Sequence, residues 1–151
     1  MTKSAFLFFL AFFLSLNVRG DHGFNRNGMI RDWSGRKDRV QEKFDWEVGN
    51  IKSQLENSKE MKEEDLKKLF EQVQKLRVVQ EVFKQQAQKL LLDEEVSQEN
   101  KKRLPGLIKL YEERLDITRE LSLTILHKTA EAMLRKNQDG VMRAGQSELP
   151  F

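Results

Sequence analysis

Side chains able to do nucleophilic or acid–base chemistry are few in this chain of 151 residues. Cysteine is absent, and the only histidines are His22 and His127. A hydrolytic site would need an imidazole beside a nucleophile such as Ser122, with a carboxylate to orient the ring. No sharp turn or glycine-rich loop presents that serine, and no His-Glu-x-x-His zinc pattern occurs. The sequence therefore predicts no catalytic residue, no cofactor and no enzymatic activity.

Acidic residues form a second group of candidates, for a divalent cation. Hard cations need several oxygen ligands that converge on one point. The acids near residue 63 are better explained as the start of a helix, and no Asp-x-Asp-x-Asp-Gly loop occurs. The candidates for weak Ca²⁺ or Mg²⁺ binding are Asp93, Glu94, Glu95 and Glu99.

A small apolar ligand is the third possibility. Leucines at 90–92 and a broad apolar stripe over 107–134 could line a lipid cavity, although such stripes also pack as core. The candidate pocket residues are Phe83, Leu90, Tyr111 and Leu115. A cavity at these residues would favour a carrier, whereas a filled core would favour an interaction module.

Gly35-Arg36-Lys37 is the fourth candidate, because a glycine before a dibasic pair is the pattern of peptide processing. Cleavage there would release a peptide that ends at Ser34. The periodic, ordered sequence that follows argues against a peptide precursor.

Helices must position all these groups. Residues 21–37 are rich in glycine and asparagine and show no period, which predicts an irregular leader. From residue 38 apolar residues recur at helical spacing and predict a helix to about residue 57. Those residues are Val40, Phe44, Val48, Ile51 and Leu55.

The stretch 63–91 is the clearest element. Three acids, Glu63, Glu64 and Asp65, stand where the dipole of a helix favours negative charge. A strict 3,4 repeat of apolar residues, broken only by Gln80, then indicates coiled-coil-like packing. Its members are Leu66, Leu69, Val73, Leu76, Gln80, Phe83, Ala87 and Leu90.

Residues 93–106 interrupt this pattern, with Asp93 and Ser97 as possible N-caps and Pro105 in the first turn of a third helix. That helix is expected over 107–134. Gly140 is a natural stop, so residues 138–151 are expected to form a flexible tail.

These elements predict an all-α fold with three main amphipathic helices in an antiparallel bundle, over residues 38–137. The second and third helices would measure about 44 and 42 Å, and matching lengths favour a hairpin within one chain. Gln80 should then face the third helix inside a monomer, and a dimer through the same seam is the alternative.

The N-terminus has the pattern of a secretory signal peptide over residues 1–20. Lys3 precedes an apolar run, Ala5 to Leu16, that is much shorter than the ~20 residues of a membrane span. Val18 and Gly20 are small enough for signal peptidase. The mature chain is expected to begin at Asp21 and to be secreted, with no transmembrane segment left.

Removal of that signal changes the charge balance. Without Lys3 and Arg19, 25 basic residues face 24 acidic residues, so the mature chain carries no electrostatic footprint for nucleic acid. The expected partner is an extracellular protein or a small apolar ligand.

Three apolar segments carry a resemblance to a known family. They are Leu66-Lys-Lys-Leu-Phe70, Val78-Val79-Gln-Glu-Val-Phe83 and the set Leu104, Leu107 and Ile108. The chain from Ile51 to about Ile117 thereby resembles the SXP/RAL family of small secreted nematode proteins. In that family a tryptophan commonly stands where Phe70 falls, and the Leu-Thr that precedes it is Met61-Lys62 here. The resemblance implies a secreted, helical, non-enzymatic protein, with cation binding in some relatives, and it transfers no binding residue.

Overall fold

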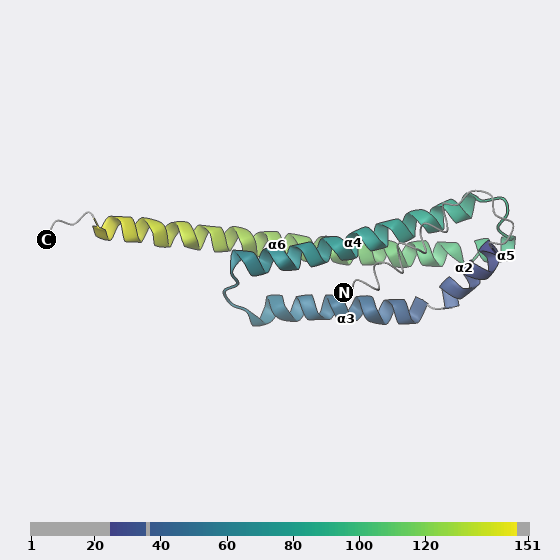
Figure 1. Cartoon of the computed structure of the whole chain (residues 1–151), viewed down its shortest axis with the longest axis horizontal. Coiled ribbons are helices and arrows are strands. Elements are labelled where there is room, and N and C mark those ends of the chain that lie inside the picture. Colours follow the sequence, from purple (N-terminus) through teal and green to yellow (C-terminus); the bar gives the residue numbers. More distant parts are fainter. Residues whose placement is uncertain (1–24, 36, 148–151) are drawn as a thin grey trace.

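A computed structural model of the chain describes residues 25–35 and 37–147, and these residues form helices joined by short loops (Figure 1). The predicted signal peptide, Asp21, His22, Arg36 and residues 148–151 lie outside the described residues, as does the side chain of Val40. The helices are α2 (Arg26–Gly35), α3 (Lys37–Asn57), α4 (Glu63–Leu92), α5 (Gln98–Lys101) and α6 (Leu104–Ser147).

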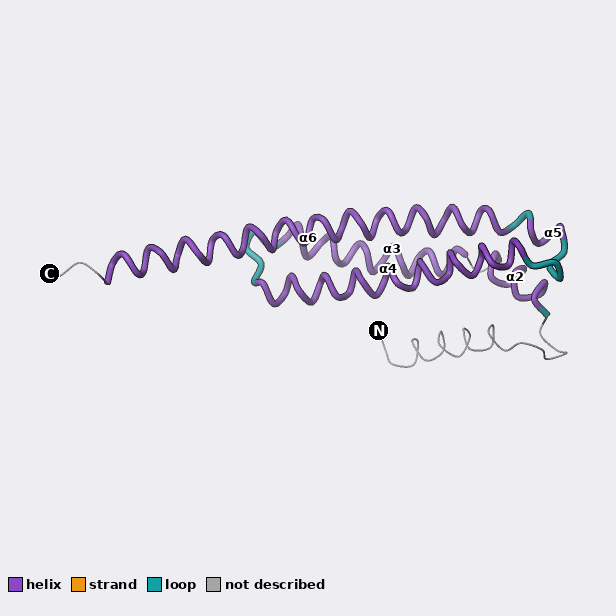
Figure 2. Tube along the Cα trace, turned by 90° about the horizontal axis from the view of Figure 1, so that it is seen from above, coloured by secondary structure: helices purple, strands orange, loops and turns teal. Residues whose placement is uncertain are grey.

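The three long helices α3, α4 and α6 lie side by side, and neighbours along the chain run in opposite directions (Figures 1 and 2). The short helices α2 and α5 lie together at one end of this bundle. The prediction of an all-α antiparallel bundle is therefore confirmed. No described helix carries an apolar stretch long enough to cross a membrane.

The seam of α4 is buried at all eight positions predicted from the 3,4 repeat. The helix begins after Lys62, whose side chain makes no capping hydrogen bond, so the three acids of the first turn supply the charge that its N-terminus favours. At the other end Asp93 takes an extended conformation and ends the helix. The heptad repeat alone therefore predicted which face of α4 is buried.

Two apolar clusters form the core, one toward each end of the bundle. The first joins α3, α4 and α6, and on α4 it ends at Leu76. The second begins on α4 at Phe83 and includes residues of α2 and α6. Between them lies a buried polar layer that consists of Gln80, Arg114 and Thr118.

The prediction of an irregular leader is wrong for residues 26–35, which form α2. Asn25 starts this helix, because its side-chain oxygen accepts a hydrogen bond from the Gly28 N–H at 3.0 Å. Ile30 is fully buried in the second cluster, and Trp33 packs against that cluster. Tertiary contacts from a few side chains stabilise a helix too short to show a clear period.

The third predicted helix is longer than expected, because α6 runs from Leu104 to Ser147 rather than over 107–134. Pro105 does stand in its first turn, and Ser97 does cap α5. Gly140 does not stop the helix, and residues 138–147 are helical rather than a flexible tail. A glycine inside a helix costs only about 1 kcal/mol relative to alanine, which the turns on either side can offset.

Candidate functional site

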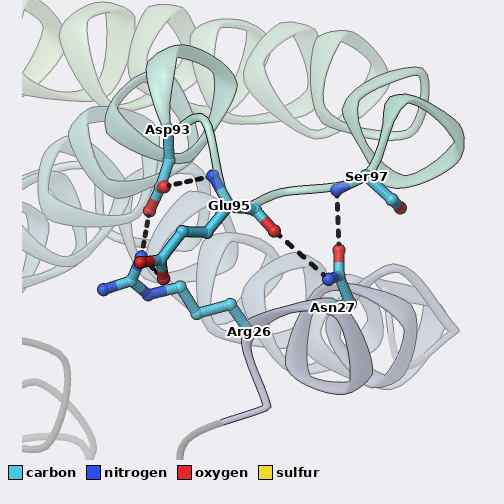
Figure 3. A network of polar contacts seen from close by, with 5 residues as sticks. All are labelled: Arg26, Asn27, Asp93, Glu95 and Ser97. Carbon is cyan, nitrogen blue, oxygen red and sulfur yellow. Dashed lines mark hydrogen bonds and ion pairs between the residues drawn. The ribbon is translucent and has the colours of Figure 1, made fainter.

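A polar network attaches α2 to the loop between α4 and α5 (Figure 3). Arg26 Nη1 lies 2.8 Å from Asp93 Oδ2 and 2.6 Å from Glu95 Oε2. Asn27 accepts a hydrogen bond from the Ser97 N–H at 2.9 Å. The network fixes α2 across the end of the bundle, where Ile30 and Trp33 can reach the core.

Two of the four predicted cation ligands, Asp93 and Glu95, are therefore paired with Arg26, whose single positive charge offsets one of their two negative charges. Glu99 lies 3.5 Å from Arg103, and Glu94 is exposed. Within residues 25–35 and 37–147, no group of three or more acids or histidines is placed to hold a metal ion.

Three aromatic rings meet where α2 crosses α4 and α6. Phe83 and Tyr111 stack with their ring centroids 5.5 Å apart, and Trp33 lies 5.8 and 5.9 Å from them. Trp33 Nε1 donates a hydrogen bond to Tyr111 Oη at 2.7 Å. Burial raises the pKa of Tyr111, while the hydrogen bond from Trp33 and the charge of Arg114 oppose that shift.

Three of the four predicted pocket residues lie together in the second apolar cluster, and the fourth lies outside it. Phe83, Leu90 and Tyr111 are buried together in the second cluster, against Ile30 and Trp33. Leu115 is half-buried outside that cluster. Side chains of α2 thus pack against three of the four predicted pocket residues, and one of these three, Phe83, also lines a groove between α3 and α4.

Arg114 is the least expected residue of the core, with only 2 % of its surface exposed. Its guanidinium carbon lies 5.0 Å from the centroid of the Phe44 ring and 5.7 Å from that of Tyr111. Nη1 donates a long hydrogen bond, 3.4 Å, to Gln80 Oε1. Nε and Nη2 have no hydrogen-bond partner among the described residues. Burial lowers the pKa of Arg114, and interactions with Tyr111 and Asp45 oppose that shift.

A groove of about 420 Å³ lies between α3 and α4, and Arg114 itself is not part of its lining. Phe44 and Gln80, which both contact Arg114, line the groove. The rest of its apolar lining comes mainly from Ile51, Leu76, Val79 and Phe83. Lys43, Trp46 and Lys75 also line it and are exposed.

The residues considered for hydrolysis are not arranged as a catalytic site. Ser122 donates to the Thr118 carbonyl at 2.9 Å and accepts from Gln74 at 3.3 Å. The exposed His127 lies 3.3 Å from Glu131, one turn further along α6. No hydrogen bond joins Ser122 to His127 in the described part of the chain.

A second surface lies on α6, opposite the face that packs in the bundle. Five large apolar side chains there form what we call the α6 stripe, and their exposure ranges from 52 % for Leu126 to 73 % for Val141. The stripe consists of Leu123, Leu126, Met133, Leu134 and Val141. Its C-terminal part lies where α6 extends past the loop between α3 and α4 (Figure 1).

Sequence analysis missed Arg114, although a signal for it exists. Buried residues of α6 recur at spacings of three and four, and Arg114 and Thr118 occupy two consecutive positions of that repeat. The repeat consists of Leu104, Leu107, Tyr111, Arg114, Thr118, Leu121 and Ile125. An arginine in such a seam, like Gln80 in the facing one, marks a polar layer.

Comparison with protein families, with curated proteins and with solved structures gives no match to this chain. The resemblance to the SXP/RAL family therefore stays a prediction.

Proposed function

We propose that the chain is a secreted, non-enzymatic helical binding protein, and that the α6 stripe is its binding surface. The observation that carries the proposal is the exposure of five large apolar residues in a row on one helix face. Contiguous exposed apolar surface is typical of interaction sites rather than of ordinary protein surface. Secretion rests on the signal peptide predicted over residues 1–20.

The spacing of the stripe favours another helix as partner. Leu123, Leu126, Ala130 and Met133 follow a 3,4 repeat, and Asn137 continues it. A single asparagine in such a seam is typical of parallel helix pairs, where it sets the register. A second copy of the chain presents the same seam, including the same asparagine, so we expect weak parallel self-association through α6. This seam differs from the α4 seam, which α6 covers within one chain.

Sedimentation velocity over a range of concentrations tests this proposal. The wild-type protein should show a monomer–dimer equilibrium, and the double substitution Leu126→Glu with Met133→Glu should leave only monomer. Arg143→Glu, at an exposed position with no residue of the α6 stripe three or four places away, changes the charge by as much as the double substitution and is the control; it should associate like the wild type. A wild-type protein that stays monomeric at the highest concentrations, or a double variant that still dimerises while folded, would contradict the α6 stripe as the surface.

A carrier of a small ligand is the second candidate function. The groove between α3 and α4 favours it, because about 420 Å³ lies within the range of small-molecule sites in proteins.

A further inference from the structure

The buried charge of Arg114 feels the charge of Asp45 but forms no close ion pair with it or with any other described acid. Five N–H groups belong to a guanidinium, yet Nη1 reaches only Gln80, and Nε and Nη2 reach no acceptor in the described structure. None of the ion pairs among the described residues includes Arg114. The rings of Phe44 and Tyr111 stabilise the cation in part. A buried charge normally requires an oppositely charged, hydrogen-bonded partner, so the site has unused capacity for an anion.

The groove gives an anion a path to this charge. Gln80 lines the groove and holds Arg114 by a hydrogen bond of 3.4 Å, longer than the usual range for N–H···O bonds. For an anion to reach the guanidinium from the groove, this amide would have to rotate away from Arg114. Lys43 and Lys75 line the same groove and outnumber its one acid, Glu47, so its lining carries a net positive charge.

The apolar part of the groove lining determines what the rest of the ligand, beyond its anionic head, should be. Ile51, Leu76, Val79 and Phe83 offer an apolar surface around the Gln80 position, with Leu76 and Phe83 one helical turn to either side of it. A ligand that matches both parts has one carboxylate and an apolar tail.

We propose that the groove between α3 and α4 binds an amphipathic monocarboxylate, with its head on Arg114 and its tail along the apolar lining. The carboxylate replaces Gln80 as acceptor and forms two parallel hydrogen bonds with the guanidinium, which is the strongest arrangement for this pair. This site is separate from the α6 stripe and does not depend on it.

Isothermal titration of the purified protein with decanoate, and with decanol as its neutral counterpart, tests the proposal. Decanoate should bind about tenfold more tightly or better, since hydrogen bonds to a charged group contribute at least that factor. Fluorescence of Trp46, which is 68 % exposed beside the groove, should shift to the blue as the tail covers it. Trp46→Phe should abolish that shift.

Substitution of Gln80 by glutamate provides the decisive variant. Gln80→Glu keeps the shape of the side chain and places a carboxylate beside Arg114, so it should stabilise the free protein and weaken decanoate about tenfold without affecting decanol. Gln85→Glu, exposed on the same helix, is the matched control and should change neither affinity.

Three outcomes would overturn the proposal. They are equal affinities of the wild type for decanoate and decanol, no binding of either, and unchanged decanoate affinity in a folded Gln80→Glu variant. If neither decanoate nor decanol binds, Arg114 has only a structural role as a cation between aromatic rings. The Leu126→Glu, Met133→Glu variant separates the ligand proposal from the self-association proposal. Decanoate should bind this variant as tightly as it binds the wild type, whether or not the wild type dimerises.

Discussion

Arg114 and its neighbours concentrate the polar chemistry of the bundle in one layer. The guanidinium lies between two aromatic rings and has one long hydrogen bond to Gln80. Removing a partner from a buried charge costs more free energy than the pair contributes, because the remaining group stays desolvated. Each residue of this layer should therefore be sensitive to substitution.

Gln80→Leu tests that sensitivity. From sequence alone this change would be expected to stabilise the protein, by removing a buried amide from an apolar seam. Because Gln80 accepts a hydrogen bond from Arg114, we instead expect the free energy of unfolding to fall by about 1–3 kcal/mol. Urea denaturation measures it, with Gln85→Leu as the exposed control. A stabilised Gln80→Leu protein would show that the hydrogen bond contributes nothing.

The single tyrosine gives a direct probe of burial. Burial raises the pKa of Tyr111 above its ordinary value of 10.0, so the folded state favours the neutral phenol. This contribution to stability is complete below pH 10 and is lost as pH rises through the higher folded pKa. Tyrosinate absorbance in native protein should therefore appear at higher pH than in urea.

Trp33→Phe extends this measurement, since it removes the hydrogen bond that lowers the Tyr111 pKa. The native titration should then move to still higher pH. Coincident titrations of native and urea-unfolded wild-type protein would show that Tyr111 is accessible to water.

Among the elements, α4 and α2 show what the sequence does and does not determine. Eight heptad positions of α4 point to one face, and periodicity alone predicts their burial. α2 spans ten residues and depends on Ile30, Trp33 and Arg26, whose partners are distant in the sequence. Arg114 was missed for a related reason, because its place in the α6 repeat indicates a polar layer only in combination with Gln80, which faces it from α4.

Ile30→Ala tests whether α2 is an integral part of the fold. Ile30 has no exposed surface, and truncation of a buried isoleucine typically costs about 2–5 kcal/mol. We expect a large drop in the urea midpoint, whereas Arg31→Ala, at an exposed position, should change little. Equal effects of the two substitutions would mean that α2 does not pack on the core in solution.

At the scale of the whole molecule, stability must come from packing alone, because the chain has no cysteine. The two apolar clusters and the polar layer between them supply this packing. The projecting part of α6 lies beyond the first helical turn of α4, where Lys136 Nζ lies 3.7 Å from Glu63 Oε1. It therefore receives little support from the bundle.

Processing of the N-terminus is a prediction at the same scale. The short apolar run and the small residues Val18 and Gly20 predict cleavage at, or within about two residues of, Asp21. N-terminal sequencing of material from the medium of expressing cells measures it. Protein that begins at Met1, or that remains in the membrane fraction, would refute the prediction.

The attachment of α2 has a consequence for the order of folding. Arg26 pairs with an acid 67 residues away, and Trp33 bonds to a tyrosine 78 residues away. The ribosome therefore releases α2 well before its partners exist, and contacts between such distant residues form slowly. We expect the α4–α6 hairpin to form first. Until α2 packs on it, Ile30 and Trp33 remain exposed to solvent, where chaperones can bind them. Among the described helices, α2 would thus be the one that stays exposed longest during folding.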